Sequence, residues 1–382
     1  MKRTLIVLLL LFIEYNITYS QSAWYQVPAV NLNGLQSVYF PVTDTGYAVG
    51  NTGVMIRTTN KGANWSLLPD IGSFDLQSVY FVNSTTGFIA QQKPNDNKIF
   101  KSTNAGINWT EQVSSVTLIS SIFFVNENTG YASGDVGKIL KTTNGGSNWN
   151  PLTTGTTNWL YNIYFVNAMT GFATGYGGKV IRTTNSGSSW DSVVSGTNST
   201  LRDIYFTNNN TGYIAGGSGT IIKTINSGIT WTTQLMGASV GFEGIFFTSI
   251  DTGFAVGGLS GGKLYKTENG GANWNIQTIP AVNDLQSIYF ANSLIGIAVG
   301  NNGAILRTTT GGIVTYISNS NNSVPISYNL YQNYPNPFNP STNISFDVPH
   351  LSNVKLIVYD YLGREITVLV NKEISPGNYQ LR

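Results

Sequence analysis

The stretch Thr58-Thr59-Asn60-Lys61-Gly62-Ala63-Asn64-Trp65 decides the fold, because variants of it return at a near-constant spacing. The shared pattern is [Ser/Thr]-x-Asn-x-Gly-x-x-Trp, and its successive tryptophans are 44, 40, 41, 41 and 43 residues apart. Such a period indicates a chain built from repeated structural units. Asn and Gly favour tight turns with positive φ, and the following tryptophan can pack against a neighbouring unit. We interpret these positions as structural: Asn60, Trp65, Asn104, Trp109, Asn144, Trp149, Asn185, Trp190, Asn226, Trp231, Asn269 and Trp274.

Each repeat contains four short segments of strand-forming residues joined by turn signals. The first is an alternating apolar run, as in residues 35–40, and it occurs seven times. It is followed by a Thr-Gly-aromatic segment (45–50), a segment ending in a basic residue (54–57) and a segment beginning at the tryptophan (65–68). Four short strands per repeat are typical of a β-propeller blade. The predicted fold is therefore all-β: a seven-bladed β-propeller followed by a small, incomplete β-sandwich.

The composition excludes several functional classes. With 42 glycines and only 10% charged residues, it favours turns and strands over helices. The net charge of +2 gives no electrostatic reason to expect nucleic-acid binding. The chain has no cysteine and a single histidine, His350, so the repeats lack the residues for thiol catalysis, Ser-His catalysis or a His-rich metal site. We expect no cofactor, no metal and no nucleic-acid partner.

The two ends of the repeat array indicate how the ring closes. The seventh repeat has its first three segments, but Thr310 replaces the turn asparagine and the tryptophan is missing. Trp24 lies 41 residues before Trp65, ahead of the first complete repeat. Residues 24–27 are therefore predicted to supply the fourth strand of the last blade, which would remove exposed sheet edges. Residues 313–317 are the alternative source of that strand.

The N-terminus is typical of a secretory signal peptide, residues 1–20. Lys2 and Arg3 precede an apolar run (4–13), and Thr18-Tyr19-Ser20 forms a small-x-small cleavage site. Cleavage is predicted after Ser20. A retained membrane anchor is the alternative, but the apolar run is short against the roughly 20 residues that span a bilayer. After cleavage we expect no stable membrane span.

The rest of the chain divides by composition. The propeller is assigned to residues 21–316, and a polar linker to 317–328. Residues 329–382 begin with a proline-rich run that disfavours helix. Predicted strands follow at 344–348, 354–359 and 366–370, with a hairpin turn at 360–363.

The repeats resemble the Asp-box (sialidase-type, BNR) propellers, although asparagine replaces the aspartate of that motif at every copy. The wider frame is Leu-x-x-Ile-x-Phe, Thr-Gly-[Tyr/Phe]-Ala-x-Gly and Lys/Arg-Thr-Thr-Asn-x-Gly-x-x-Trp. It is similar to the photosystem II stability/assembly factor-like propellers and covers about residues 24–316. The resemblance implies the propeller fold and says little about function.

The C-terminal run Asn333-Tyr334-Pro335-Asn336-Pro337-Phe338-Asn339-Pro340-Ser341-Thr342 resembles the start of a type IX secretion (type A) C-terminal sorting domain, as do the later Val358-Tyr359-Asp360 and Gly363-Arg364-Glu365. The resemblance implies a Bacteroidetes-like bacterium, export across both membranes, and the type IX machinery as partner. Such domains normally continue for several more strands, so residues 329–382 are interpreted as a truncated sorting domain. The expected location is secreted or on the outer cell surface.

The basic residues of the propeller do not indicate a sialidase active site. A sialidase would need an arginine triad, a tyrosine nucleophile with a glutamate partner, and an aspartate. Here one repeat position carries a basic residue in all seven copies: Arg57, Lys101, Lys141, Arg182, Lys223, Lys266 and Arg307. Such a ring follows from the repeat itself, so we interpret it as structural, with an anion-binding belt as the functional alternative.

The first strand of each repeat departs from the pattern in a way that indicates a site. Its second position reads Gln36, Gln77, Ser120, Tyr161, Arg202, Glu243 and Gln286, and its third reads Ser37, Ser78, Ser121, Asn162, Asp203, Gly244 and Ser287. Charged groups on an innermost strand are expected to face the central channel, because burying them without water is costly. The candidate ligand-binding residues are Tyr161, Asn162, Arg202, Asp203 and Glu243.

We therefore expect a non-enzymatic, exported β-propeller that binds an extracellular protein or glycan. Asp203 and Glu243 could instead form the paired carboxylates of a glycan-active hydrolase with a sialidase-like fold, or could pair with Arg202. An assembly factor like the photosystem proteins is a further alternative, which rests on resemblance alone.

Overall fold

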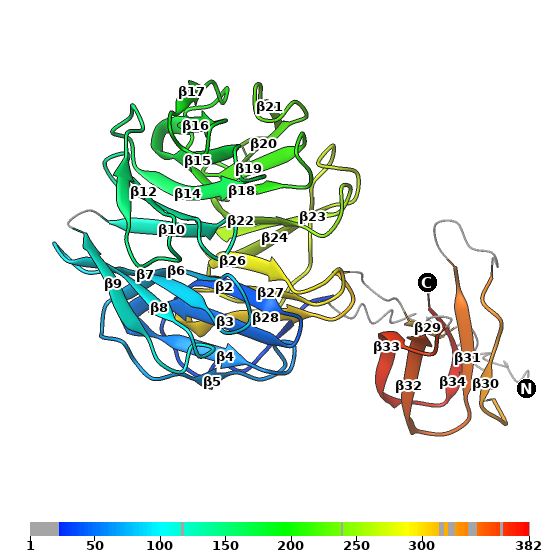
Figure 1. Ribbon diagram of the computed structural model, residues 1–382. Coiled ribbons are helices and arrows are strands. Elements are labelled where there is room, and N and C mark those ends of the chain that lie inside the picture. The colour runs from blue at the N-terminus through cyan, green and yellow to red at the C-terminus, as the bar shows by residue number, and fades with distance from the viewer. Residues whose placement is uncertain are drawn as a thin grey trace, which may run out of the picture. The chain divides into compact units, whose positions relative to one another are not determined.

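The computed structural model describes residues 23–115, 118–237, 240–312, 317–319, 325–334, 342–359 and 362–381. The chain forms two compact units, residues 22–312 and a second unit that contains residues 313–382 (Figure 1). The predicted signal peptide lies outside the described residues, as do the Pro335–Ser341 part of the sorting motif and the Asp360-Tyr361 turn. Among the described residues, no helix is long and apolar enough to cross a membrane.

The larger unit is the predicted all-β propeller, built in its described part from seven four-stranded antiparallel sheets. Blades one to three comprise β2(Leu35–Val42), β3(Thr45–Gly50), β4(Met55–Thr58), β5(Ser66–Leu67); β6(Asp75–Phe81), β7(Gly87–Gln92), β8(Asn97–Ser102), β9(Thr110–Ser115); and β10(Ile119–Phe124), β11(Gly130–Gly134), β12(Ile139–Thr142), β13(Asn150–Leu152). Blades four to six comprise β14(Leu160–Phe165), β15(Gly171–Gly175), β16(Val180–Thr183), β17(Asp191–Val193); β18(Leu201–Phe206), β19(Gly212–Gly216), β20(Thr220–Thr224), β21(Thr232–Leu235); and β22(Phe242–Phe247), β23(Gly253–Gly258), β24(Gly262–Thr267), β25(Asn275–Ile276). Blade seven contains β26(Leu285–Phe290), β27(Gly296–Gly300) and β28(Ile305–Thr308), and short 3-10 turns lie at η1(Asn51–Gly53), η2(Tyr176–Gly178) and η3(Asn301–Gly303).

The N-terminal segment closes the ring, as predicted. Strand β1(Tyr25–Gln26) pairs antiparallel with β28, and the Val27 N–H donates to the Ile305 carbonyl at 2.9 Å. Trp24 beside this strand is completely buried and makes edge-on contacts with Phe254 and Phe290. The fourth strand of the last blade therefore comes from the N-terminus. Residues 313–316 of the alternative lie outside the described ranges, and Ile317 begins a strand of the second unit.

Each [Ser/Thr]-x-Asn-x-Gly-x-x-Trp turn is held by a small hydrogen-bond network. In the fourth blade, the buried Thr183 hydroxyl donates to the Asn185 Oδ1 at 2.9 Å and accepts from the N–H groups of Asn185 and Gly187. The Asn185 Oδ1 also accepts from the Ser189 N–H at 2.9 Å. The motif spacing thus places one hydroxyl and one amide oxygen where they satisfy the backbone donors of the turn. An asparagine supplies the same acceptor oxygen as an aspartate would, and in this blade its amide nitrogen also donates to the Ser189 hydroxyl at 2.9 Å.

Replacing Thr183 by valine is expected to lower the free energy of unfolding by about 1–3 kcal/mol, because the buried Gly187 N–H loses its acceptor while the side-chain shape is kept. Denaturant unfolding of the full chain measures the change. Thr184→Val is the matched control, since Thr184 is the exposed neighbour and should change stability by less than about 0.5 kcal/mol. Equal effects of the two variants would contradict this role of the motif.

Six of the seven residues in the basic ring join neighbouring blades. Lys101 donates to the Gly145 carbonyl at 2.7 Å, Lys141 to the Ser186 carbonyl at 2.7 Å and Arg182 to the Ser227 carbonyl at 2.9 Å. Lys223, Lys266 and Arg307 make equivalent contacts with Gly270, Gly312 and Lys61. In the first blade the Tyr47 hydroxyl reaches the Ala105 carbonyl instead, beside Arg57. The basic heads are thus largely occupied by turn carbonyls, which fits the structural interpretation.

The second unit is a small β structure. Its four-stranded sheet has the order β29(Ile317–Asn319), β34(Gly377–Leu381), β31(Ile344–Val348) and β30(Asn329–Leu330), and a hairpin joins β32(Ser352–Tyr359) to β33(Glu365–Ile374). The predicted strand at 344–348 is reproduced, and those at 354–359 and 366–370 are longer than expected. The first three residues of the expected linker, 317–319, are a strand paired with β34 instead.

Candidate functional site

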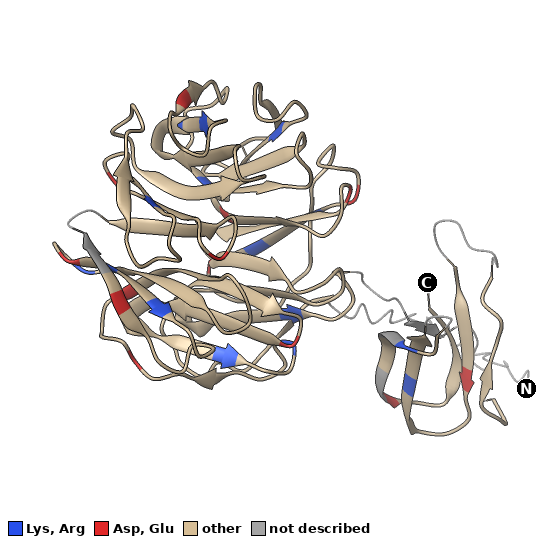
Figure 2. Ribbon diagram, in the orientation of Figure 1, with Lys and Arg blue, Asp and Glu red and all other residues tan. Residues whose placement is uncertain are grey.

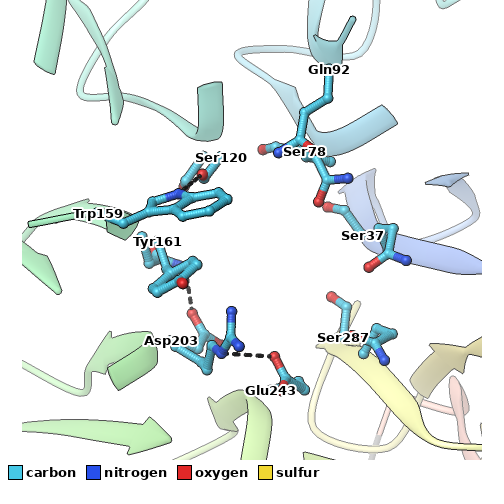
Figure 3. Close-up of a pocket in the computed structure, with 15 residues that line it drawn as sticks. Ser37, Ser78, Gln92, Ser120, Trp159, Tyr161, Asp203, Glu243 and Ser287 are labelled. Carbon is cyan, nitrogen blue, oxygen red and sulfur yellow. Dashed lines mark hydrogen bonds and ion pairs between the residues drawn. The ribbon is translucent and has the colours of Figure 1, made fainter. Parts of the chain in front are cut away.

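A polar cavity of about 490 Å³ lies at one end of the channel, between the first strands of the seven blades (Figure 3). It brings together all five candidate residues: Tyr161, Asn162, Arg202, Asp203 and Glu243. Its other lining residues are Gln36, Ser37, Gln77, Ser78, Gln92, Ser120, Ser121, Trp159, Gln286 and Ser287.

A bulge in each inner strand explains why two consecutive side chains face the same cavity. In all seven blades the register shifts between the first and third residues of the first strand, for example between Leu201 and Asp203. A regular strand would turn alternate side chains to opposite faces. The bulge leaves the second residue unpaired and bends the strand, so that Arg202 and Asp203 both reach the cavity.

Blades three to six form an aromatic and charged wall. The Trp159 Nε1–H donates to the Ser120 hydroxyl at 2.8 Å, which orients the indole, and its ring stacks on Tyr161 at 5.0 Å. The Arg202 guanidinium lies 4.2 Å from the centre of the Tyr161 ring, a cation–π contact. Its Nε also lies 3.4 Å from the Glu243 carboxylate. Figure 3 shows the Trp159 indole extending toward the open centre of the cavity.

Asp203 is held by three donors from three blades. Its Oδ1 accepts from the Asn162 amide at 2.7 Å and from the Ile204 N–H at 2.9 Å, and its Oδ2 accepts from the Ile245 N–H at 2.8 Å. Burial raises the pKa of Asp203 to about 7, against the opposing effect of the two backbone donors and with a smaller contribution from Glu243. Burial also raises the pKa of Glu243, which the positive charge of Arg202 offsets in part.

The contacts of Asp203 follow a pattern shared with other blades. Ser37 accepts from the Val79 N–H at 3.3 Å, and Ser78 from the Ile122 N–H at 3.2 Å. In both cases the third residue of one inner strand bonds the backbone of the next blade, as Asp203 bonds Ile245. Asp203 is therefore the carboxyl member of an inter-blade bonding position, and both of its oxygens accept hydrogen bonds from the protein.

Beyond the cavity, the fifth residues of the inner strands form a closed girdle of aromatic rings, which we call the aromatic girdle. Neighbouring ring centres are 4.8–6.1 Å apart all the way around. Burial raises the pKa of every girdle tyrosine, to about 12 for Tyr289 and higher still for Tyr39, whose hydroxyl bonds its two neighbours. The members of the aromatic girdle are Tyr39, Tyr80, Phe123, Tyr164, Tyr205, Phe246 and Tyr289.

Three features of the site escaped the sequence reasoning. Trp159 comes directly before its inner strand, at a position outside the repeated motifs. No other repeat has a tryptophan at that position. Gln92 ends a second strand, and only folding brings it to the cavity. The aromatic girdle was visible as an aromatic residue at the fifth position of every inner strand, a signal that could have been used. Within the described ranges, no three His, Cys, Asp or Glu side chains are grouped as a metal site.

The comparisons with known proteins show the fold. No family model matches the sequence, and no curated protein does either. Among solved structures, the chain is similar to YCF48 bound to D1 peptide, with a TM-score of 0.65 and 19% identity over 77% of this chain and 99% of that one. It is similar to YCF48 from Cyanidioschyzon merolae (TM-score 0.62, 19% identity, 75% and 99% covered). It also matches the Niastella koreensis GH74 enzyme (TM-score 0.63, 13% identity, 91% and 62% covered). The chain is thus a β-propeller whose structural neighbours include both YCF48 and GH74 enzymes.

Proposed function

We propose that this chain is a binding module that uses the polar cavity to hold an extracellular protein or glycan. The observation that carries the proposal is the wall formed by Trp159, Tyr161, Arg202 and Glu243. These side chains interrupt an otherwise neutral repeat at adjacent blades and meet in one cavity. The size of the cavity lies within the range of small-ligand sites. Figure 2 shows the acidic and basic residues spread over many strands and loops of the propeller.

Export is part of the same proposal. The basic and apolar N-terminal pattern supports secretion by a signal peptide, and the motif at 333–342 supports passage through type IX machinery to the cell surface or the medium. Fusion of residues 317–382 to a reporter in a type IX-competent bacterium tests this role. Failure of the reporter to reach the medium or cell surface, while a complete sorting domain succeeds, would contradict export by this route.

Two other functions are kept as alternatives. A glycan-active hydrolase is supported by two carboxyl groups of raised pKa in one cavity and by the fold likeness to a GH74 enzyme. The three donors that hold Asp203 weigh against it. An assembly factor is supported only by the fold likeness to YCF48, one of whose structures is bound to a D1 peptide. Chromatographic detection of glycan products that disappear in Glu243→Gln would favour the hydrolase.

Replacing Trp159 by alanine is expected to weaken ligand binding at least tenfold, because the largest ring of the wall is lost. Arrays of defined glycans and peptides, probed with the full chain, provide the measurement. Gln234→Ala is the control, since Gln234 lies on the outer strand β21, outside the cavity lining, and its amide bonds Thr232 and Thr233. Binding that survives Trp159→Ala unchanged, or an array on which the chain binds nothing, would contradict the proposed site.

A further inference from the structure

The lining of the cavity indicates which ligand it takes. Apart from two aromatic rings, every side chain that lines it is an amide, a hydroxyl or a charged group. Among the described residues, the amides of Gln77, Gln92 and Gln286 make no hydrogen bond to the protein, whereas Gln36 bonds Asn51. Three unpaired amides offer both donors and acceptors to a ligand. An apolar anchor of a peptide would find no aliphatic pocket here.

The charged side chains of the cavity mainly contact other groups of the protein. Arg202 lies against Glu243 and the Tyr161 ring, and Asp203 is bonded to Asn162 and two backbone N–H groups. The lining holds one cation and two carboxyl groups, so it has no excess positive charge with which to attract an anion. This set of contacts suits an uncharged ligand rich in hydroxyl groups.

The aromatic wall adds a surface for the apolar face of a sugar ring. Trp159 is partly exposed, and its indole is fixed by Ser120 and by stacking on Tyr161. A rigid aromatic ring provides a large apolar contact at low conformational cost. Neighbouring hydroxyl-bonding groups on Gln92 and Ser120 can then recognise the edge of the sugar.

The aromatic girdle lies in the path of a ligand that enters more deeply than the polar cavity. Its rings lie two residues beyond the third-position side chains on the same strands, which corresponds to about 7 Å along the channel. The rings form an unbroken circle, and each of the seven side chains is partly exposed, so the girdle faces the channel. The polar cavity is therefore followed along the channel by a ring of aromatic side chains.

We propose that the ligand is a neutral glycan whose chain end enters the cavity, with a sugar ring against Trp159 and the free glutamine amides on its hydroxyl groups. This inference rests on the proposed binding function and names its ligand class. A ligand that threaded through the propeller would have to pass the aromatic girdle, so the chain end is the part that is recognised.

The test uses isothermal titration of the full chain with defined probes. The neutral probes are linear cello-, xylo-, manno- and malto-oligosaccharides, with α-cyclodextrin as a neutral glucan that has no chain end. The other probes are an oligogalacturonate and a set of unrelated decapeptides. At least one linear neutral series is expected to bind, with an affinity that stops rising after the first few sugar units. The double variant Gln77→Ala/Gln92→Ala is expected to weaken binding at least tenfold, and Gln234→Ala to leave it unchanged.

Each other outcome overturns a defined part of the inference. Cavity-dependent binding of the decapeptides alone would remove the glycan and leave the proposed binding function standing. Preference for the oligogalacturonate would remove the requirement for a neutral ligand. Binding of α-cyclodextrin as tight as that of the linear malto-oligosaccharide would remove end recognition. If no probe binds in a way that depends on Trp159, Gln77 or Gln92, both the inference and the proposed function are wrong.

Discussion

Replacing Trp24 by alanine is expected to lower the free energy of unfolding of the propeller by about 3–5 kcal/mol, the usual cost of removing a buried aromatic side chain. Trp24 is completely buried, and its ring contacts Phe254 in blade six and Phe290 in blade seven. It therefore anchors β1 to two blades at the point where the ring closes. Denaturant unfolding with tryptophan and far-UV signals gives the magnitude.

Trp190→Ala is the matched control, because Trp190 occupies the same repeat position within an uninterrupted blade and is also buried. Both variants should lose stability, but hydrogen exchange should separate them. Loss of protection is expected in β27 and β28 for Trp24→Ala, since β1 is the only described partner of the outer edge of β28. A change of less than about 1 kcal/mol in Trp24→Ala would mean that the N-terminal strand does not hold the ring closed.

Replacing Asp203 by alanine is expected to destabilise the propeller by roughly 2–5 kcal/mol, because each backbone donor left without an acceptor costs about 1–3 kcal/mol. The donors are the N–H groups of Ile204 and Ile245, which belong to two adjacent inner strands. Ser37→Ala is the control at the same repeat position, and it removes one longer, neutral bond from Val79. Its cost should stay near 1 kcal/mol. If both variants lost a similar free energy of unfolding, the carboxyl group of Asp203 would contribute no more to stability than the Ser37 hydroxyl.

The pH dependence of stability provides a second measurement at Asp203. Its pKa is about 7 in the folded protein and 3.8 in the unfolded chain, so the folded state keeps its proton over this range while the unfolded state releases it. Stability should therefore fall as pH rises from about 4 to about 7, by up to about 1.4 kcal/mol per pH unit, and level off above. Asp203→Asn carries no titrating group, so the stability of wild type relative to this variant should fall over the same interval. A difference that is constant with pH would contradict the raised pKa.

Because Asp203 bonds the backbone of a neighbouring blade, its substitution is a poor test of ligand binding. A variant that weakens the contact between blades four, five and six will disturb the cavity whether or not Asp203 touches a ligand. Trp159, Gln77 and Gln92 are better probes. In the described part of the chain, the amides of the two glutamines make no hydrogen bond to the protein, and the Trp159 indole N–H bonds a side chain, that of Ser120. Binding data on Asp203 variants are therefore informative only beside a measurement of stability.

The sequence by itself determined the repeat architecture of the propeller. The turn motif ending at Trp65 recurs with a constant period, and each copy carries its own hydroxyl, amide oxygen and glycine, so local chemistry specifies every turn independently. Even the closing strand could be predicted, because Trp24 stands one period ahead of Trp65 without a preceding repeat. Periodicity also identified the five variable residues on the inner strands.

Only the tertiary structure decided which partners hold those residues. The bulge that turns both Arg202 and Asp203 toward the cavity leaves no mark in the alternation of the strand. From the sequence alone, Asp203 fits a catalytic carboxylate. Its hydrogen bonds from Asn162 and Ile245, on two other blades, are visible only in the folded structure. The aromatic girdle likewise needs ring closure to bring Tyr289 against Tyr39. These contacts join residues about 40 to 250 positions apart, so they depend on how the blades are arranged around the channel, and a local pattern contains no record of that arrangement.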